Sequence, residues 1–115
     1  MADRFVIILA TCSSKQEAER IAASILKKRL AACGNIVDGV RSRFWWQGKI
    51  DSASEVLLMF KTRLTNFKRI EKEIKRIHSY EVPEIIALPI VAGSKEYLGW
   101  IEKVTHAAPT RSEES

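Results

Sequence analysis

The chain has 115 residues, of which 46% are hydrophobic and 29% are charged, and its formal net charge is +5. This length suits one domain with one core, and the composition is that of a soluble globular protein. The 14 acidic residues are interspersed with the 19 basic ones, which excludes the basic block of a nucleic-acid-binding arm. The longest apolar runs, Val56–Phe60 and Ile85–Val91, are too short to cross a bilayer, and Met1–Arg4 leads directly into a predicted strand. We therefore expect a cytoplasmic protein with no membrane span and no nucleic-acid partner.

The start of the chain predicts a strand followed by a helix. Phe5–Thr11 is a short, nearly continuous apolar run, which is typical of a strand covered on both faces. Ser14–Glu17 has the order of a capping box, and apolar residues then recur at helical spacing. This pattern predicts a helix over Lys15–Arg29. Gly34 and Asn35 tolerate unusual backbone angles and favour a turn after the helix.

The middle of the chain predicts a long β-hairpin. Strand-favouring residues fill Ile36–Trp46 and Val56–Thr62, and the polar run Gln47–Ser54 lies between them. The second strand is apolar on both faces and is therefore expected in the centre of the sheet. The first strand alternates, so that Trp45 and Trp46 point to opposite faces near its end. Large aromatic side chains at a hairpin tip are hard to cover within one small domain, so we expect a partner surface to cover them.

The second half of the chain predicts a helix, a short strand and a final helix. The helix begins near Thr65–Asn66 and ends near His78–Ser79. Its isoleucines form a stripe along one side, and basic residues lie on the opposite side. Two prolines bracket a strand over Glu84–Leu88, because proline cannot donate to a ladder. Gly93–Ser94 precedes the final helix.

The predicted order is strand, helix, strand, strand, helix, strand and a final helix. Two β-α-β units joined through the central hairpin make an α+β fold, the ferredoxin-like split βαβ sandwich with helices on one face of an antiparallel sheet. We expect residues 1–106 to form this domain. The polar stretch 107–115 is predicted to be a disordered tail.

Few side chains could carry chemistry. Cys12 and Cys33 are too few for a disulfide framework, and no pair of cysteines or histidines has the local spacing of a metal site. A packed thiol is the ordinary interpretation of each cysteine, and a hydrogen-bonded residue at a helix end is that of His78. The sequence has no nucleophile elbow and no glycine-rich phosphate loop, although the hydroxyls at Ser13 and Ser14 could hold an anion at a helix start. We expect no enzymatic activity.

Several segments together resemble one family, the CutA divalent-cation tolerance proteins. The resemblance runs from about Phe5 to Val104, and it is carried by Ala10–Ser14, Lys28–Cys33, Ser42–Ile50, Glu55–Thr62, His78–Ile86 and Tyr97–Ile101. It implies a ferredoxin-like subunit similar to the PII signalling proteins, and a homotrimer in which the long hairpins pair between subunits. It also implies a role in tolerance of copper and other divalent cations, since some family members bind copper.

The resemblance further implies where sites should lie. It places Phe44, Trp45 and Trp46 at the trimer interface. The clefts between subunits are expected to contain Trp46, Lys49, Lys61, Tyr80 and Glu84. Cu(II) or another divalent metal would be bound by His78, Cys33 and Cys12. The chain departs from copper-associated members at Ala10, where they have a cysteine, and at Ile77, where they have the first of two adjacent histidines.

Three other functions stay open on the sequence alone. A small acylphosphatase-like enzyme shares the size and the strand-helix plan, but it needs an arginine after the first strand, where only Lys15 stands. An RNA-binding domain of the RRM type displays stacking aromatics in a pattern that this chain lacks. A trimeric scaffold for another protein is the third.

Overall fold

Four strands form one antiparallel sheet in the computed structural model, which describes residues 4–106. Across the sheet the order is β2-β3-β1-β4, and every neighbouring pair is antiparallel. Their bounds are β1 (Phe5–Cys12), β2 (Cys33–Trp46), β3 (Lys49–Arg63) and β4 (Ile85–Pro89). Because β3 lies between β1 and β2, those two strands are parallel and are joined by a helical crossover. The predicted α+β fold and the central position of the second hairpin strand are both confirmed.

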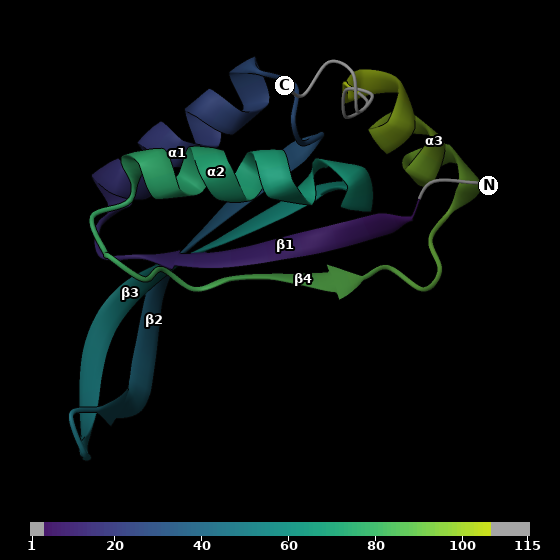
Figure 1. Cartoon of the computed structure of the whole chain (residues 1–115). Coiled ribbons are helices and arrows are strands. Elements are labelled where there is room, and N and C mark those ends of the chain that lie inside the picture. The colour runs from purple at the N-terminus through teal and green to yellow at the C-terminus, as the bar shows by residue number, and fades with distance from the viewer. Residues whose placement is uncertain (1–3, 107–115) are drawn as a thin grey trace.

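The main helices cover one face of this sheet (Figure 1). They are α1 (Lys15–Lys27) and α2 (Phe67–Ile77), which pack against each other. The third helix, α3 (Lys95–Val104), contacts β3, where Arg63 donates to the carbonyl of Glu102. A single 3₁₀ turn, η1 (Leu64–Asn66), leads from β3 into α2. None of the helices within residues 4–106 is long and apolar enough to cross a membrane. The tail predicted at 107–115 lies outside the described residues.

The start of α1 follows the prediction, and its end does not. The Ser14 hydroxyl accepts a hydrogen bond from the Glu17 N–H at 3.1 Å, as an N-cap does. The helix ends at Lys27 rather than at Arg29, because Arg29 takes a left-handed φ of 55°. The Leu30 N–H then bonds to the carbonyl five residues back, and the Arg29 N–H bonds to the carbonyl three residues back, which is a Schellman motif. An arginine in the position where glycine is usual gave no signal in the sequence.

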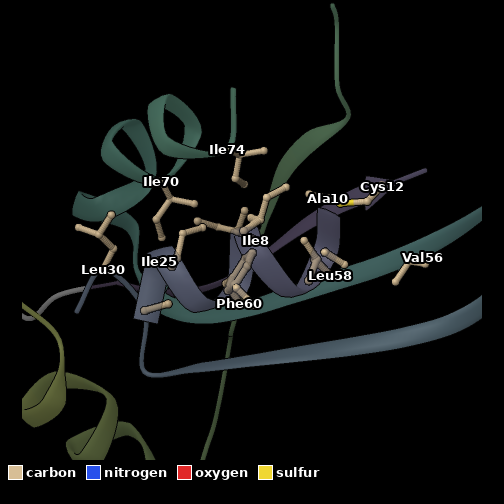
Figure 2. Packing of buried hydrophobic residues seen from close by; sticks show 14 of the residues in the cluster. Ile8, Ala10, Cys12, Ile25, Leu30, Val56, Leu58, Phe60, Ile70 and Ile74 are labelled. Atoms are coloured by element: carbon tan, nitrogen blue, oxygen red, sulfur yellow. The ribbon is translucent and has the colours of Figure 1, made fainter. Parts of the chain in front are cut away.

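The core lies between the sheet and the two main helices. Figure 2 shows its apolar side chains meeting from β1, β3, α1 and α2, among them Ile8, Ala10, Leu58, Phe60, Ile25, Ile70 and Ile74. Phe60 is fully buried, and a Cβ at Gly34 would lie 3.0 Å from its ring. Gly34 is therefore required by close packing inside β2, which begins at Cys33, and not by the turn that the sequence predicts there.

The hairpin is longer than predicted. Its turn consists of only Gln47 and Gly48, whose φ angles of 50° and 76° are the positive values that a type I′ turn requires. The run Gln47–Ser54, interpreted from its polarity as the connection, is mostly strand, since Lys49 already pairs with Trp46. Figure 1 shows the outer halves of β2 and β3 leaving the body as an arm, which we define as residues 40–55. The polar residues of the arm are those of a strand whose faces are exposed in this subunit.

A buried carboxylate ties α1 to α2. Glu73 on α2 accepts hydrogen bonds from Arg76 at 2.7 Å on its own helix, and from Ser24 and from Lys28 at 3.0 Å on α1. These bonds, that of Arg76 above all, hold the pKa of the Glu73 carboxyl at about 2, below the ordinary value of 4.5, although burial acts in the opposite direction.

We predict that Glu73→Gln lowers the free energy of unfolding at pH 7 by about 1–2 kcal/mol, because charge-assisted bonds are lost. The figure stays small because the side chains of Lys28 and Arg76 are more than half exposed and solvent screens them. Since the folded-state pKa is depressed, the contribution is complete above about pH 4.5 and disappears as pH falls toward about 2. The difference between wild type and variant should therefore shrink in that range.

Urea unfolding at pH 7 and pH 3 measures this difference. Glu71→Gln is the matched control, because Glu71 pairs with Lys68 and Lys75 on the same helix but its side chain is 28% exposed, against 7% for Glu73. A Glu73→Gln variant no less stable than Glu71→Gln at pH 7 would contradict the prediction.

Candidate functional site

A buried polar cluster lies where β1 ends. Cys12 is the last residue of β1, Glu17 lies in the first turn of α1, and His78 follows the end of α2. All three side chains are buried, and one donor atom from each lies within 4.8 Å of the others. Two of the metal ligands predicted from the resemblance, Cys12 and His78, are thus brought together, and a carboxylate joins them.

Hydrogen bonds determine the protonation of His78. Its ring Nε2 lies 2.6 Å from the carbonyl oxygen of Thr11, and its Nδ1 accepts the backbone N–H of Tyr80 at 3.0 Å. A carbonyl only accepts and a backbone N–H only donates, so these two contacts match the tautomer that carries its proton on Nε2 and an electron pair on Nδ1. The same Nδ1 lies 3.6 Å from Oε1 of Glu17.

The two oxygens of Glu17 have different surroundings. Oε2 accepts the backbone N–H of Ser79 at 2.9 Å. Oε1 is buried, since Glu17 is only 4% exposed, and it has no hydrogen-bond partner within residues 4–106. Leaving a buried polar atom without a partner costs about 1–3 kcal/mol, so such atoms are rare in folded proteins.

Cys12 is held as a neutral thiol. It is completely buried at one end of the core, as Figure 2 shows. Burial, followed by the nearby charges of Glu17 and Glu55, raises the pKa of the Cys12 thiol to about 12. A buried thiol of this kind is inert in the absence of a cation.

A groove of about 820 Å³ opens beside this cluster. Its walls are the arm and the loop after α2, and the residues that line it include Thr11, Phe44, Trp46, Asp51, Glu55, Tyr80 and Glu84. The hydroxyl of Tyr80 donates to Glu55 at 3.1 Å across the groove, and burial together with this bond raises the pKa of that hydroxyl. Three predicted cleft residues, Trp46, Tyr80 and Glu84, therefore share one groove within a single subunit.

The other predicted site residues lie elsewhere. Cys33 pairs with Lys61 on β3, five residues along from Val56, the partner of Cys12. At about 3.3 Å per residue, Cys33 lies roughly 16 Å from Cys12 along the sheet and outside the cluster. Neither Lys61 nor Lys49 is among the described residues that line the groove. Lys61 instead donates a hydrogen bond to Asn35, and Lys49 lies at the tip of the arm, where it pairs with Trp46.

The aromatic side chains of the arm are exposed in the subunit. The exposed fraction is 74% for Trp45, 59% for Trp46 and 38% for Phe44, and Ile50 across the hairpin is 57% exposed. An apolar surface of this kind on a small protein marks an interaction site.

Comparison with known proteins assigns the chain to a family. Residues 6–104 match the family model described as CutA1 divalent ion tolerance protein. The chain belongs to the CutA family. The divalent-cation tolerance protein CutA of Archaeoglobus fulgidus is 48% identical to it over 96 residues, covering 84% of this chain and 93% of the relative. That of Thermus thermophilus is 42% identical over 99 residues, covering 86% and 96%.

Solved CutA structures have the same fold. CutA1 from Oryza sativa aligns with a TM-score of 0.88 at 39% identity, covering 90% of this chain and 95% of that one. The A. fulgidus structure, described as periplasmic, aligns with a TM-score of 0.86 at 45% identity, covering 89% and 99%. The chain spans only 56% of the length of the chloroplastic CutA 1 of rice, with which it is 41% identical over 100 residues. The predicted family is confirmed.

Sequence reasoning missed Glu17 as a site residue. Its place in a capping box explains it as a helix-start residue, and its distance from His78 depends on the packing of α1 and α2. The chain departs from copper-associated members at Ala10 and Ile77, and both positions belong to the hydrophobic core. Ala10 is fully buried in it, and Ile77 is partly buried and packs against it.

We predict that Cys12 is almost unreactive in the folded, metal-free protein. With a pKa of about 12, roughly one Cys12 in ten thousand carries a thiolate at pH 8. In a Cys33→Ser variant, iodoacetamide at pH 8 should therefore modify the folded protein at least about a hundredfold more slowly than the unfolded protein in guanidinium.

Mass spectrometry of timed samples gives the rates. A Cys12→Ser variant, which retains the partly exposed Cys33, is the control for reagent quality. Rapid stoichiometric modification of the folded Cys33→Ser variant would contradict both the burial and the raised pKa.

Proposed function

We propose that the protein is a non-enzymatic homotrimer that acts in tolerance or homeostasis of divalent metal cations, with copper as the leading candidate. Family membership supports the cation role, because the archaeal and bacterial relatives are named divalent-cation tolerance proteins. The trimer would be a signalling unit of PII-like architecture that responds to a bound ion or small ligand.

The main support for the proposed trimer is the arm, whose aromatic side chains are exposed in the single subunit. The arm projects from the body (Figure 1), and its apolar side chains Phe44, Trp45, Trp46 and Ile50 are 38–74% exposed in the described part of the subunit. Burying one large apolar side chain contributes about 1.5–3 kcal/mol. Arms that pair between subunits around a three-fold axis would cover these side chains and would give each arm an equivalent partner.

The same assembly would complete the groove. Trp46, Tyr80 and Glu84 line the groove in one subunit, whereas Lys49 is carried at the tip of an arm. We propose that Lys49 of a neighbouring arm, together with Lys61, approaches this cleft in the trimer. Cu(II) or another divalent ion would be bound through Cys12 and His78. Cys33 is left out of this ligand set because it lies on β2, which β3 separates from Cys12 on β1.

The alternative functions have less support. Lys15, the cation that an acylphosphatase-like reaction would need after β1, is paired with Asp38 at 3.2 Å. A trimeric scaffold for another protein is compatible with the same arm and is the second candidate. We propose the cytoplasm as the place of action, which the two free thiols favour, while relatives carry chloroplastic and periplasmic in their names.

Mass measurement in solution tests the trimer. Light scattering should give about three times the subunit mass of 13.0 kDa. Trp45→Glu combined with Trp46→Glu places charges where the arms would meet, so the trimer should dissociate at micromolar concentration.

Leu26→Lys is the matched control, because Leu26 is a partly exposed apolar residue on α1, away from the arm. Circular dichroism verifies that each variant is folded. A monomeric wild type, or a double variant that keeps the trimeric mass, would overturn the proposed assembly.

Calorimetric titration with Cu(II) tests the cation role. Reduced, chelator-treated protein should give a saturable heat with a defined stoichiometry per subunit, and Mg²⁺ at the same concentration should give none because it prefers all-oxygen sites. A flat Cu(II) titration would remove copper from the proposed function.

A further inference from the structure

We propose that Cys12, Glu17 and His78 form a buried Zn(II) site with one ion per subunit. The inference deepens the proposed cation function, on which its cellular meaning rests, but the geometry of the three side chains stands without it. The positions where copper-associated family members differ from this chain, Ala10 and Ile77, take no part.

The donor atoms are spaced closely enough for one ion. Zinc bonds of about 2.3 Å to sulfur and 2.0–2.2 Å to nitrogen and oxygen give ligand separations of roughly 3.4–3.6 Å in a tetrahedron. Oε1 of Glu17 already lies 3.6 Å from Nδ1 of His78. One donor atom from each of the three side chains lies within 4.8 Å of the other two. Small side-chain movements of this order, about 1 Å, are what would bring three such donors to the distances of a tetrahedral site.

The ring of His78 is oriented as in known metal sites. Its Nε2–H donates to the carbonyl of Thr11, and metal-binding histidines commonly donate their second ring N–H in this way. Nδ1 therefore carries the free electron pair on the side of Glu17. That pair now accepts the Tyr80 N–H, which lies in the loop between α2 and β4, so an ion must displace this single bond.

The unpartnered oxygen of Glu17 is a second, independent observation that points to a bound cation. Its Oε1 is buried and unpartnered within the described chain, while Oε2 is anchored by the Ser79 N–H and keeps the carboxylate turned toward His78. A cation bound at Oε1 would satisfy this atom, which no donor within residues 4–106 reaches.

The charges of the site also match a divalent cation. A Cys12 thiolate and the Glu17 carboxylate together carry two negative charges, which one dication neutralises. The carboxylates of Glu17 and Glu55 by themselves oppose a thiolate at Cys12, and a bound dication would reverse that effect.

The donor set selects the kind of cation. One sulfur, one nitrogen and one oxygen donor suit the borderline ion Zn(II), whereas Ca²⁺ and Mg²⁺ require six or more oxygens, and Cu(I) prefers more than one soft sulfur. The open groove adjoins the cluster, because its lining residues Thr11 and Tyr80 hydrogen-bond to the ring of His78 through their backbone groups.

Co(II) and Zn(II) titrations of the reduced, chelator-treated full-length protein test the site. Co(II) should produce a near-ultraviolet thiolate charge-transfer band that saturates at one equivalent per subunit and disappears on addition of Zn(II). Cys12→Ser should abolish the band. Glu17→Gln keeps the shape of the side chain, and it should weaken Zn(II) binding at least about tenfold while the band persists at high Co(II).

Cys33→Ser is the matched control and should leave both the band and the affinity unchanged. Circular dichroism and the solution mass identify any variant that fails to fold, and the wild-type titration alone decides the case if both site variants misfold. Absence of the band in wild type, or its loss in Cys33→Ser with retention in Cys12→Ser, would overturn the inference.

The two proposals fail separately. A trimer that binds Cu(II) but shows no Co(II)–thiolate band would refute the buried site and leave the proposed function standing. A monomeric protein that binds Zn(II) at Cys12 would leave the site standing and overturn the proposed trimer.

Discussion

The structure depends on β3, because this one strand belongs both to the core and to the arm. Its inner half, with Leu58 and Phe60, is buried between β1 and β2 beneath α1 and α2. Its outer half, from Lys49 to Ser54, is exposed and pairs only with β2. Burial of the inner half therefore determines where the arm leaves the body. A register shift between Val37 and Val40, on the facing strand, lies at that point.

The polar cluster follows from the same packing. Cys12 pairs with Val56, which follows Glu55, the first buried residue of β3, so the end of β1 lies next to the base of the arm. The start of α1 and the end of α2 meet above this point, and they bring Glu17 and His78 to Cys12. In the proposed site, an ion shared by the three side chains would satisfy the Glu17 oxygen that has no hydrogen-bond partner within residues 4–106.

The groove connects the cluster with the arm. Tyr80 has its backbone N–H on the ring of His78 and its hydroxyl on Glu55 at the base of the arm. A change at His78 that releases the Tyr80 N–H would therefore act on a residue that lines the groove beside Trp46. In the proposed trimer this is the route by which an occupied cation site would alter the surface between subunits.

The sequence by itself determined the element order, the α+β class and the family, because apolar periodicity and short motifs are local properties of the chain. It misjudged the arm, since exposed strand residues such as Lys49–Ser54 have the same polarity as a loop, and the end of α1, since Arg29 occupies a position usual for glycine. It named Cys12 and His78 as site residues. Only the tertiary structure added Glu17 and separated Cys33, because strand register and helix packing decide the distances between residues remote in the sequence.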